Sequence, residues 1–389
     1  MKKAIVFPYS NEFKPVMDYS QILNSEFDIK ALIAPKGWRL DGTEVPYRKY
    51  NIEGQYLWVQ SNFADALNGD INMLIIPNYA DNPTYDLKVI ELIIRHIDKF
   101  NTIICYKKFD SDNYDLLHEK CKHVNCEIID NVTPRDLDVF LLGDTKDFNL
   151  KKYEEFSSAV QAITTPIIAV AGIGEKTDKF EVSLVLRDIF IKAGYKVSQI
   201  GSKNYCELLD FHSFPSFLFN PQIDERLKII CFNKYIKQIE IEECPDIIII
   251  TIPGAMKAFS ENITQGFGLL HYMVFQAVLV DYLIVCSYLG TDFSNSLSRE
   301  SEICKNRYGC NIDCCHISNT IIDYNATRYM GRIITNLLPR TYVDKAVLDS
   351  NTYADSIVVD ILNDNSREKL YHDILKKLNS DYSIVWFII

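Results

Sequence analysis

The sequence predicts an α/β protein made of two domains, each with a largely parallel sheet covered by helices. The chain has 389 residues, which is more than one hydrophobic core usually organises. Short apolar runs alternate with stretches of helical periodicity along most of its length, and this alternation is typical of parallel sheets with helices on both faces. Hydrophobic residues make up 48% of the chain, too many for a disordered protein.

Charge and cysteine content limit the function classes. A formal net charge of −11 disfavours binding to nucleic acids or to anionic membranes, because both need a basic surface. The sequence has no run of about 18 apolar residues that would predict a membrane-spanning helix. The eleven cysteines form no regular framework, so we expect reduced thiols in a cytoplasmic protein.

The first domain is expected over residues 1–145 and is Rossmann-like. Residues 86–100 place apolar side chains at helical spacing after a capping Thr84, and residues 112–122 form a second helical stretch. The turn at residues 8–11 carries no glycine fingerprint, so it indicates a dinucleotide site only weakly. The predicted strands are Ala4–Tyr9, Asp28–Ala34, Met73–Pro77, Thr102–Tyr106 and Glu127–Ile129.

A second series of strands begins after a predicted connecting helix at residues 146–165. Residues 166–340 are expected to form the second domain, in which the apolar run Ile247–Ile250 is typical of a central parallel strand. The tail, residues 341–389, is either a small α+β extension or a set of extra strands on the second sheet. The predicted strands are Pro166–Ala171, Lys196–Ile200, Asp246–Ile252, Tyr282–Ser287 and Ile312–Ile317, followed in the tail by Ile357–Ile361, a helix at Arg367–Leu378 and Ser383–Ile388.

The most informative segment is the turn after the first strand of the second domain. Gly172, Gly174, Lys176 and Thr177 lead to Lys179, which opens a helix. In a P-loop, backbone N–H groups wrap a phosphate, a helix N-terminus points at it and a lysine neutralises its charge. The sequence therefore predicts a P-loop NTPase-like domain with a phosphate site at these five residues.

The loop departs from the usual P-loop pattern at two positions. The glycine that normally precedes the lysine is Asp178, and the Ser or Thr that normally ligates magnesium is Phe180. A carboxylate beside a phosphate repels it, and the lost hydroxyl removes a metal ligand. The loop could bind nucleotide weakly, could use Asp178 on a metal, or could be a relic. An ordinary turn between a strand and a helix is the simplest alternative.

The nine residues Gly172–Phe180 resemble the G-T-G-x-x-x-G-K-T loop of dethiobiotin synthetase and its relatives, cyclic 2,3-diphosphoglycerate synthetase among them. The resemblance implies a site for ATP or GTP with magnesium. In that class a later strand ends in an acidic residue, whereas the matching strand here ends in Thr251 and Ile252. No catalytic residue is assigned by the pattern; the candidates are Lys179, Asp178 and Lys203, and the weak candidates for holding a metal are Asp178 and Asp246.

Further segments spread over nearly the whole chain are Gly37-Trp38, Lys179–Glu181, Gly194–Ser202, Phe211–Pro215, Ile252–Gly254, Asn262–Gly268 and Asp313–Cys315. Together they resemble one clostridial family, the peptide-maturation-system proteins encoded beside radical-SAM maturases of small cysteine-rich peptides. The resemblance implies a role in making a ribosomally synthesised, modified peptide. It implies the precursor peptide or the maturase as a partner, and it names no reaction.

Two loops of the second domain could add to the site, because loops at the carboxyl ends of parallel strands line the ligand crevice. Ser202 and Lys203 end the second strand of this domain, and Asp210 and His212 follow them. All four could face a phosphate or a peptide. Cys206 with His212 could be a nucleophile and its base, but a loop anchored by its phenylalanines is the simpler interpretation.

The loop that follows the apolar strand holds Asn262 and Gly266, and the glycine suits a close backbone approach to a bound group. We count both as candidates for a substrate or peptide loop. His271 lies one turn into the next helix, where a buried, hydrogen-bonded histidine is the simpler expectation.

A cysteine-rich stretch invites a metal interpretation. It contains no C-x-x-C pair, and neighbouring residues of a strand point to opposite faces, so a tetrahedral zinc site is not expected. Free buried thiols are the simpler alternative, and the role of the set is left open. Its members are Cys304, Cys310, Cys314, Cys315 and His316.

These observations predict an accessory protein of peptide maturation that binds a peptide, a maturase or a nucleotide. One alternative is an ATP- or GTP-dependent ligase or kinase-like enzyme acting on the peptide. The other is a structural scaffold whose loop binds nothing. The oligomeric state is not predicted.

Overall fold

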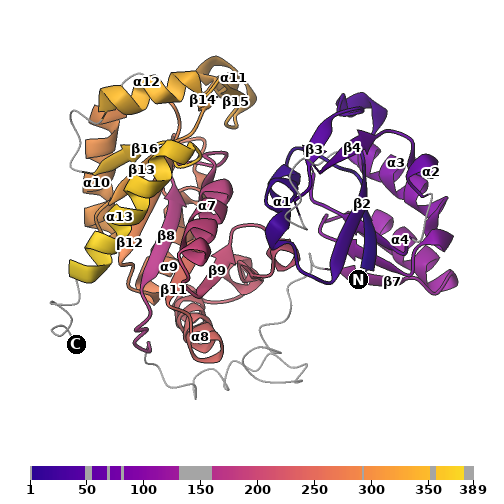
Figure 1. Cartoon of the computed structure of the whole chain (residues 1–389), viewed down its shortest axis with the longest axis horizontal. Helices are drawn as coiled ribbons and strands as arrows, with labels where there is room; N and C mark the ends of the chain where they lie inside the picture. The colour runs from indigo at the N-terminus through magenta and orange to yellow at the C-terminus, as the bar shows by residue number, and fades with distance from the viewer. Residues whose placement is uncertain are drawn as a thin grey trace. The chain divides into compact units, whose positions relative to one another are not determined.

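A computed structural model of the chain describes residues 2–48, 55–67, 71–79, 83–130, 160–290, 293–350 and 356–380. The chain forms two compact units (Figure 1). The first consists of residues 1–135 with 204–213, and the second of residues 136–203 with 214–389. Among the described residues, no helix has the length and apolar character needed to cross a membrane.

The first unit has a Rossmann-type sheet. Its strand order is β3-β4-β2-β1-β5-β6-β7, and every neighbouring pair is parallel except β3 with β4. Numbered along the chain, the parallel strands of the described part therefore lie in the order 3-2-1-4-5-6, the order of dinucleotide-binding folds. The bounds are β1 Lys2–Val6, β2 Phe27–Ile33, β3 Glu44–Pro46, β4 Tyr56–Gln60, β5 Met73–Ile76, β6 Thr102–Cys105 and β7 Glu127–Asp130.

Helices of the first unit follow local signals. Pro83 begins α3, where its missing N–H costs nothing, and Ile90 and Ile93 are buried on the inner side of this helix. Asp110 caps α4 by accepting a hydrogen bond from the Asn113 backbone N–H at 2.8 Å. The helix bounds are α1 Lys14–Asp18, α2 Phe63–Ala66, α3 Pro83–Ile94 and α4 Ser111–His123.

The second unit is built on another parallel sheet, in which β9-β11-β8-β12-β13-β16 are neighbours in that order. The predicted α/β class with two parallel sheets is thus confirmed. Because β16 pairs with β13, the tail contributes an edge strand to this sheet. The predicted strand Ser383–Ile388 lies outside the described residues. The bounds are β8 Ile167–Gly172, β9 Val197–Gly201, β11 Ile247–Thr251, β12 Tyr282–Ser287, β13 Cys314–Ile317 and β16 Ile357–Val359.

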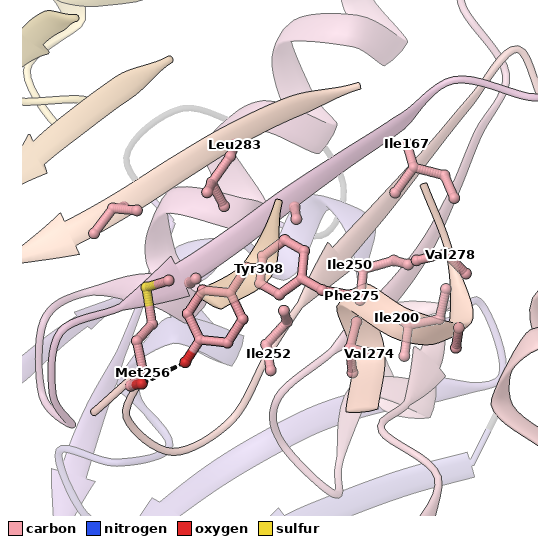
Figure 2. Close-up of a cluster of buried hydrophobic side chains, with 14 of the residues drawn as sticks. Ile167, Ile200, Ile250, Ile252, Met256, Val274, Phe275, Val278, Leu283 and Tyr308 are labelled. Atoms are coloured by element: carbon pink, nitrogen blue, oxygen red, sulfur yellow. Dashed lines mark hydrogen bonds between the residues drawn. The ribbon is translucent and has the colours of Figure 1, made fainter. Parts of the chain in front are cut away.

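The second sheet is covered on both faces. Alternate residues such as Ile248 and Ile250 point into a core shared with α8, α9, α10 and α12, of which Figure 2 shows a part. Helix α7 packs on β8, β9 and β11, and Phe190 of α7 contacts Tyr371 of α13. The bounds are α7 Lys179–Lys192, α8 Glu225–Glu243, α9 Leu269–Ala277, α10 Phe293–Tyr308, α11 Tyr324–Met330, α12 Thr341–Ser350 and α13 Asp364–Ser380, with an antiparallel pair β14 Thr320–Ile322 and β15 Thr335–Leu337.

The segment that leads into β8 is irregular rather than helical where it is described. The connecting helix predicted at residues 146–165 falls largely outside the described residues, and residues 160–164 have no helical structure. Glu240 of α8 holds this segment: one carboxylate oxygen accepts hydrogen bonds from the Thr164 and Thr165 backbone N–H groups, both at 2.7 Å, and from the Thr164 hydroxyl at 2.9 Å. A buried carboxylate thus replaces the hydrogen bonds that a helix would supply.

Replacing Glu240 with alanine should lower the free energy of unfolding by about 2–3 kcal/mol, because two backbone N–H groups lose a charged acceptor. Burial raises the pKa of Glu240, but its hydrogen bonds from Lys237, Thr165 and Thr164 outweigh this effect and bring the pKa to about 2. This stabilisation is therefore present above about pH 4.5 and is lost as the pH falls toward 2. Denaturant titrations at pH 7 and pH 3 test it, with the exposed Glu242→Ala as control.

Candidate anion-binding site

The loop Ile173–Asp178 lies at the point where the strand order of the second sheet changes direction. The chain leaves β8 and places β9 and β11 on one side of it, then β12 and β13 on the other. In open α/β sheets a ligand binds beyond the carboxyl ends of the strands at such a switch point. The predicted loop is therefore located where this fold places its ligands.

Contacts from the two neighbouring strands hold the loop. The Gly172 carbonyl accepts a hydrogen bond from the Met256 N–H at 2.9 Å, and the Ile173 N–H donates to the Cys286 carbonyl at 3.0 Å. The Tyr288 hydroxyl donates to the Glu175 carbonyl at 2.6 Å. The loop is therefore tied to the segment after β11 on one side and to β12 on the other.

Both glycines of the loop are required by close packing. A Cβ added to Gly172 would lie 2.7 Å from the Lys179 side chain and 2.7 Å from the Thr177 hydroxyl. A Cβ added to Gly174 would lie 2.7 Å from a ring carbon of Tyr288. The Thr177 hydroxyl in turn donates to the Gly174 carbonyl at 3.1 Å. The glycines thus let the lysine and the tyrosine close over the loop.

Gly174→Ala should lower the free energy of unfolding by about 1–3 kcal/mol, because its methyl group forces Tyr288 out of its place above the loop. The same displacement should weaken any ligand held by the loop. Gly290→Ala is the matched control, since nothing lies within 4 Å of a Cβ at that position. Equal stability of the two variants in denaturant titrations would contradict the packing argument.

Lys179 is a buried cation at the first position of α7. Its side chain is 8% exposed, and its ammonium donates to the Gly254 carbonyl in the segment after β11. Burial lowers the pKa of Lys179 to about 8. The described structure therefore holds a costly positive charge beside a helix N-terminus, an arrangement suited to an anion.

Asp178 adopts a left-handed conformation, with φ of 62°, at the position where a P-loop normally has glycine. Aspartate tolerates this region better than most residues. Its carboxylate lies 3.5 Å from Nε2 of His316 and 3.4 Å from Arg340. Burial raises the pKa of Asp178, but hydrogen bonds from His316 and Ser318 and the charge of Arg340 hold it below its ordinary value.

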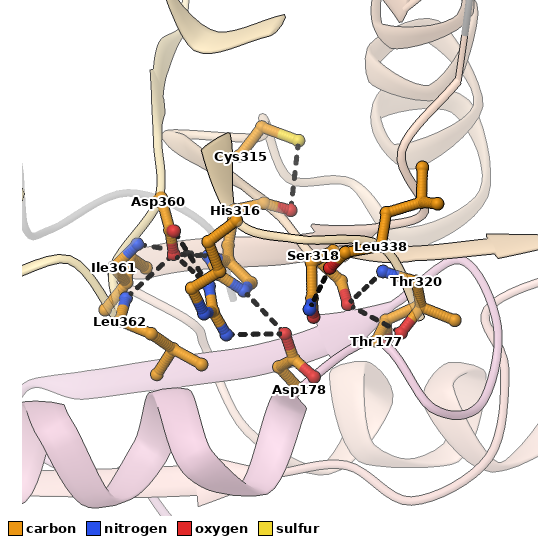
Figure 3. Close-up of polar contacts among 12 residues, drawn as sticks. Thr177, Asp178, Cys315, His316, Ser318, Thr320, Leu338, Asp360, Ile361 and Leu362 are labelled. Atoms are coloured by element: carbon orange, nitrogen blue, oxygen red, sulfur yellow. Dashed lines mark hydrogen bonds and ion pairs between the residues drawn. The ribbon is translucent and has the colours of Figure 1, made fainter. Parts of the chain in front are cut away.

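The carboxylate of Asp178 belongs to a polar network at the ends of β13 and β16 (Figure 3). Arg340 donates from one nitrogen to both oxygens of the buried Asp360, at 2.8 and 2.7 Å. Nδ1 of His316 accepts the Ile361 N–H at 3.1 Å, so the ring proton resides on Nε2 and faces Asp178. Asp178 is therefore engaged by this network rather than left to repel a phosphate.

The two positions that hold magnesium in a P-loop carry no ligand here. Phe180 is 2% exposed, and Thr251, at the carboxyl end of β11, is fully buried. Asp246 precedes β11 and lies at the opposite end of the sheet from the loop, where it accepts the Lys196 N–H at 2.7 Å. Within the described residues no group of three His, Cys, Asp or Glu side chains could hold a metal ion.

The other predicted residues are dispersed. Ser202 and Lys203 follow β9 in the second unit, and Lys203 is close enough for its charge to act on Lys179. Residues 204–213, which include Asp210 and His212, group with the first unit. There the Tyr205 hydroxyl donates to the Glu12 carbonyl at 2.8 Å. Asp210 and His212 therefore belong to the first unit, whereas Lys179 belongs to the second.

Residues 262–268 make a turn with unusual backbone geometry. Four consecutive residues, Gln265–Gly268, have positive φ angles between 48° and 74°. Gly268 caps α9 and packs against Met256, whose carbonyl carbon would lie 2.7 Å from an added Cβ. Asn262 and Gly266 are exposed at the outer side of this turn. The turn brings the start of α9 next to the segment that holds Lys179.

The cysteine set is divided by the sheet. Cys304 and Cys315 belong to the core beneath α10, whereas Cys314 and His316 are at alternate positions on the other face of β13. The four cysteines of the set are free thiols, and Cys310 is partly exposed. Of this set, His316 alone contacts the loop, through Asp178.

Arg340, Asp360 and Tyr288 take part in the site without having been predicted. Each is separated from the loop by more than 100 residues and has no local motif, so only the pairing of β12, β13 and β16 beside β8 brings them close. A position at the carboxyl end of a strand was the one signal that could have found Tyr288 and Asp360.

The fold and the loop define the class of this protein: a Rossmann-ordered unit joined to a unit with a P-loop-type strand, loop and helix. No protein-family model matches the sequence. A search of curated proteins also finds no match.

Among solved structures the chain is similar to a DUF1611 family protein from Anabaena variabilis, with a TM-score of 0.62 and 11% identity over 97% of this chain and 100% of that chain. At this identity the likeness shows the fold alone. A second match is the signal recognition particle 54 kDa protein from Aeropyrum pernix in complex with GDP, with a TM-score of 0.29 and 9% identity over 77% of this chain and 61% of that chain. A likeness of that size carries no argument, and neither structure bears on peptide maturation.

Proposed function

We propose that the second unit binds a phosphate-bearing ligand, such as a nucleotide, at the loop Gly172–Lys179. The observation that carries the proposal is the buried Lys179 ammonium at the N-terminus of α7, with a backbone carbonyl as its acceptor. A phosphate would replace the Gly254 carbonyl and supply the negative charge that a buried ammonium lacks. The two packed glycines support the proposal because they let the Lys179 side chain and Tyr288 lie close to the loop backbone.

The position of Asp178 removes the main objection to an anion in this loop. Its carboxylate is paired with Arg340 at 3.4 Å and lies 3.5 Å from Nε2 of His316. Its negative charge is thereby largely offset at the helix start. Asp178 thus serves to hold the loop in its left-handed turn, where a P-loop relies on glycine.

Magnesium-dependent phosphoryl transfer is a weaker proposal for this site. A ligase or kinase of the P-loop type holds magnesium with a hydroxyl after the lysine and an acidic residue at the end of a neighbouring strand. Phe180 and Thr251 occupy these positions. The residues present therefore favour binding of a phosphate over its transfer.

We further propose that this binding serves an accessory role in maturing a ribosomally synthesised peptide, with the precursor or its radical-SAM maturase as partner. This part rests on the sequence resemblance and on no contact in the structure. Co-expression of a precursor, its maturase and this chain tests it: Lys179→Ala should lower the yield of modified peptide. An undiminished yield without this chain would remove the accessory role and leave the phosphate site standing.

Ligand-dependent thermal stabilisation tests the site itself. ATP, GTP and pyrophosphate at millimolar concentration should raise the melting temperature of the wild-type chain, because a ligand that binds only the folded state stabilises it. Sodium chloride at equal ionic strength is the control for general salt effects. If none of the three ligands shifts the melting temperature more than sodium chloride does, the scaffold alternative replaces this proposal.

A further inference from the structure

His271 is a buried side chain with unused hydrogen-bonding capacity. It is 0% exposed, and neither ring nitrogen has a hydrogen-bond partner among the described residues. Leaving such a group unsatisfied costs about 1–3 kcal/mol, and native proteins contain few of them. A residue of this kind in the first turn of α9 therefore calls for an explanation beyond core packing.

The backbone places His271 beside the loop. Met256 donates to the Gly172 carbonyl, and Gly268, the cap of α9, packs on the carbonyl of the same Met256. The Lys179 ammonium is bonded to Gly254, two residues before Met256. The first turn of α9 and the end of the Lys179 side chain thus meet at one short segment, Gly254–Met256.

Electrostatics agree with this placement. Burial, and after it the charge of Lys179, lower the pKa of His271 well below its ordinary value. The ring is therefore neutral at pH 7 and has one N–H donor and one acceptor nitrogen. The acceptor can take an N–H of the Lys179 ammonium, which leaves the donor for an oxygen of the ligand.

The residues at the usual magnesium-binding positions give a second reason to expect that His271 contacts the ligand. Phe180 and Thr251 remove the hydroxyl and the carboxylate that place magnesium against a phosphate. The Thr251 hydroxyl is buried and, within the described residues, makes no hydrogen bond. A ligand bound here needs other groups to offset its charge, and those near the loop are the Lys179 ammonium, the nearby charge of Lys203 and neutral donors.

We propose that His271 is a ligand-binding residue of this site and that, with Lys179, it holds a phosphoryl group without a divalent cation. This inference rests on the proposed phosphate site and specifies how that site works. His271 receives an N–H from the lysine and donates its own N–H to a phosphoryl oxygen. The ring thereby orients the lysine and supplies a contact that magnesium would otherwise make.

Calorimetric titration with pyrophosphate, once in EDTA and once in magnesium chloride, tests the proposal. The wild-type chain should bind equally well in both. His271→Phe keeps a ring of similar size but removes both nitrogens, and it should weaken binding at least tenfold. It should not lower the melting temperature of the free protein, because it removes a buried unsatisfied group. His271→Asn, which retains a donor, should recover part of the affinity.

His372→Gln is the matched control, since His372 is 69% exposed on α13. The inference is overturned if wild-type binding needs magnesium, or if His271→Phe binds pyrophosphate as tightly as wild type. In either case the proposed phosphate site survives. If the wild-type chain binds neither pyrophosphate nor ADP in either buffer, the phosphate site itself fails, and this inference fails with it.

Discussion

Lys179→Met should raise the free energy of unfolding of the free protein at pH 7 by about 1–2 kcal/mol while abolishing its binding of phosphate-bearing ligands. The side chain is 8% exposed, and its pKa of about 8 lies well below the ordinary lysine value of 10.5. Such a shift corresponds to a cost of about 3 kcal/mol for holding the ammonium in the folded state. The variant also loses the hydrogen bond to the Gly254 carbonyl, which offsets about 1 kcal/mol of this gain in stability.

The effect should depend on pH in a defined direction. Between about pH 8 and pH 10.5 the unfolded chain keeps a proton on Lys179 that the folded chain has released. The stability contributed by this residue therefore rises with pH across that window. Denaturant titrations at pH 7 and pH 10 should show that the advantage of Lys179→Met at pH 7 disappears at pH 10. A variant that is less stable than wild type at pH 7 would contradict the argument.

Arg340→Met should be strongly destabilising, by about 2–4 kcal/mol at pH 7. Arg340 bonds both oxygens of Asp360, which is 2% exposed, and lies 3.4 Å from the carboxylate of Asp178. Removing one partner of a buried ion pair leaves an uncompensated charge, which typically costs 3–5 kcal/mol. We expect a smaller loss than this typical value because the Arg340 side chain is 38% exposed and its charge is partly screened by solvent.

The loss of unfolding free energy caused by Arg340→Met should be smaller at acidic pH. The pKa of Asp178 is held below its ordinary value, against the effect of burial, by His316, Ser318 and Arg340. Its stabilisation is present at neutral pH and is lost as the pH falls below about 4, so wild type and variant should converge there. Arg332→Met, at an exposed position nearby in the sequence, is the control. If Arg340→Met and Arg332→Met unfold at the same denaturant concentration at pH 7, the network does not hold the loop.

Sequence periodicity located most strands of both sheets, because buried parallel strands are short, apolar and bounded by turns. It predicted Tyr282–Ser287 with the bounds that β12 has, and it placed β8, β9 and β11 within one residue at their starts. Strands β3, β4, β14 and β15 escaped prediction. They are short or half exposed, and Trp58 and Leu337 show more than half of their surface to solvent. An apolar run is no guide where a strand is not buried.

The helices show the same division. Lys179–Lys192 was expected because a glycine-bearing turn precedes it and buried residues follow at helical spacing. Helix α8 was missed, although Asp224 caps it by accepting from Arg226 at 3.0 Å. Its apolar residues are not confined to the buried side, since Ile241 is 64% exposed, so their spacing indicates no single face.

The candidate site could be predicted only in its local part. Gly172, Gly174 and Lys179 form a motif in consecutive sequence, so residue spacing suffices to find them. The partners of Asp178 come from β13 and from residues beyond α11, and only the strand order brings them together. The sequence therefore indicates that Asp178 stands where a P-loop has glycine, and the structure shows which residues its carboxylate contacts.

The pH dependence of ADP affinity tests most directly whether the buried Lys179 supplies the counter-charge for a bound phosphate. ADP suits this range because the last proton of a phosphate group is lost with a pKa of about 6, below the pH range measured. We expect wild-type affinity to be constant from pH 7 to about pH 8 and then to fall, by up to tenfold for each further pH unit, as Lys179 loses its proton. We also expect Lys179→Met not to bind. Affinity that stays constant to pH 10, or equal binding by Lys179→Met, would contradict this role of Lys179.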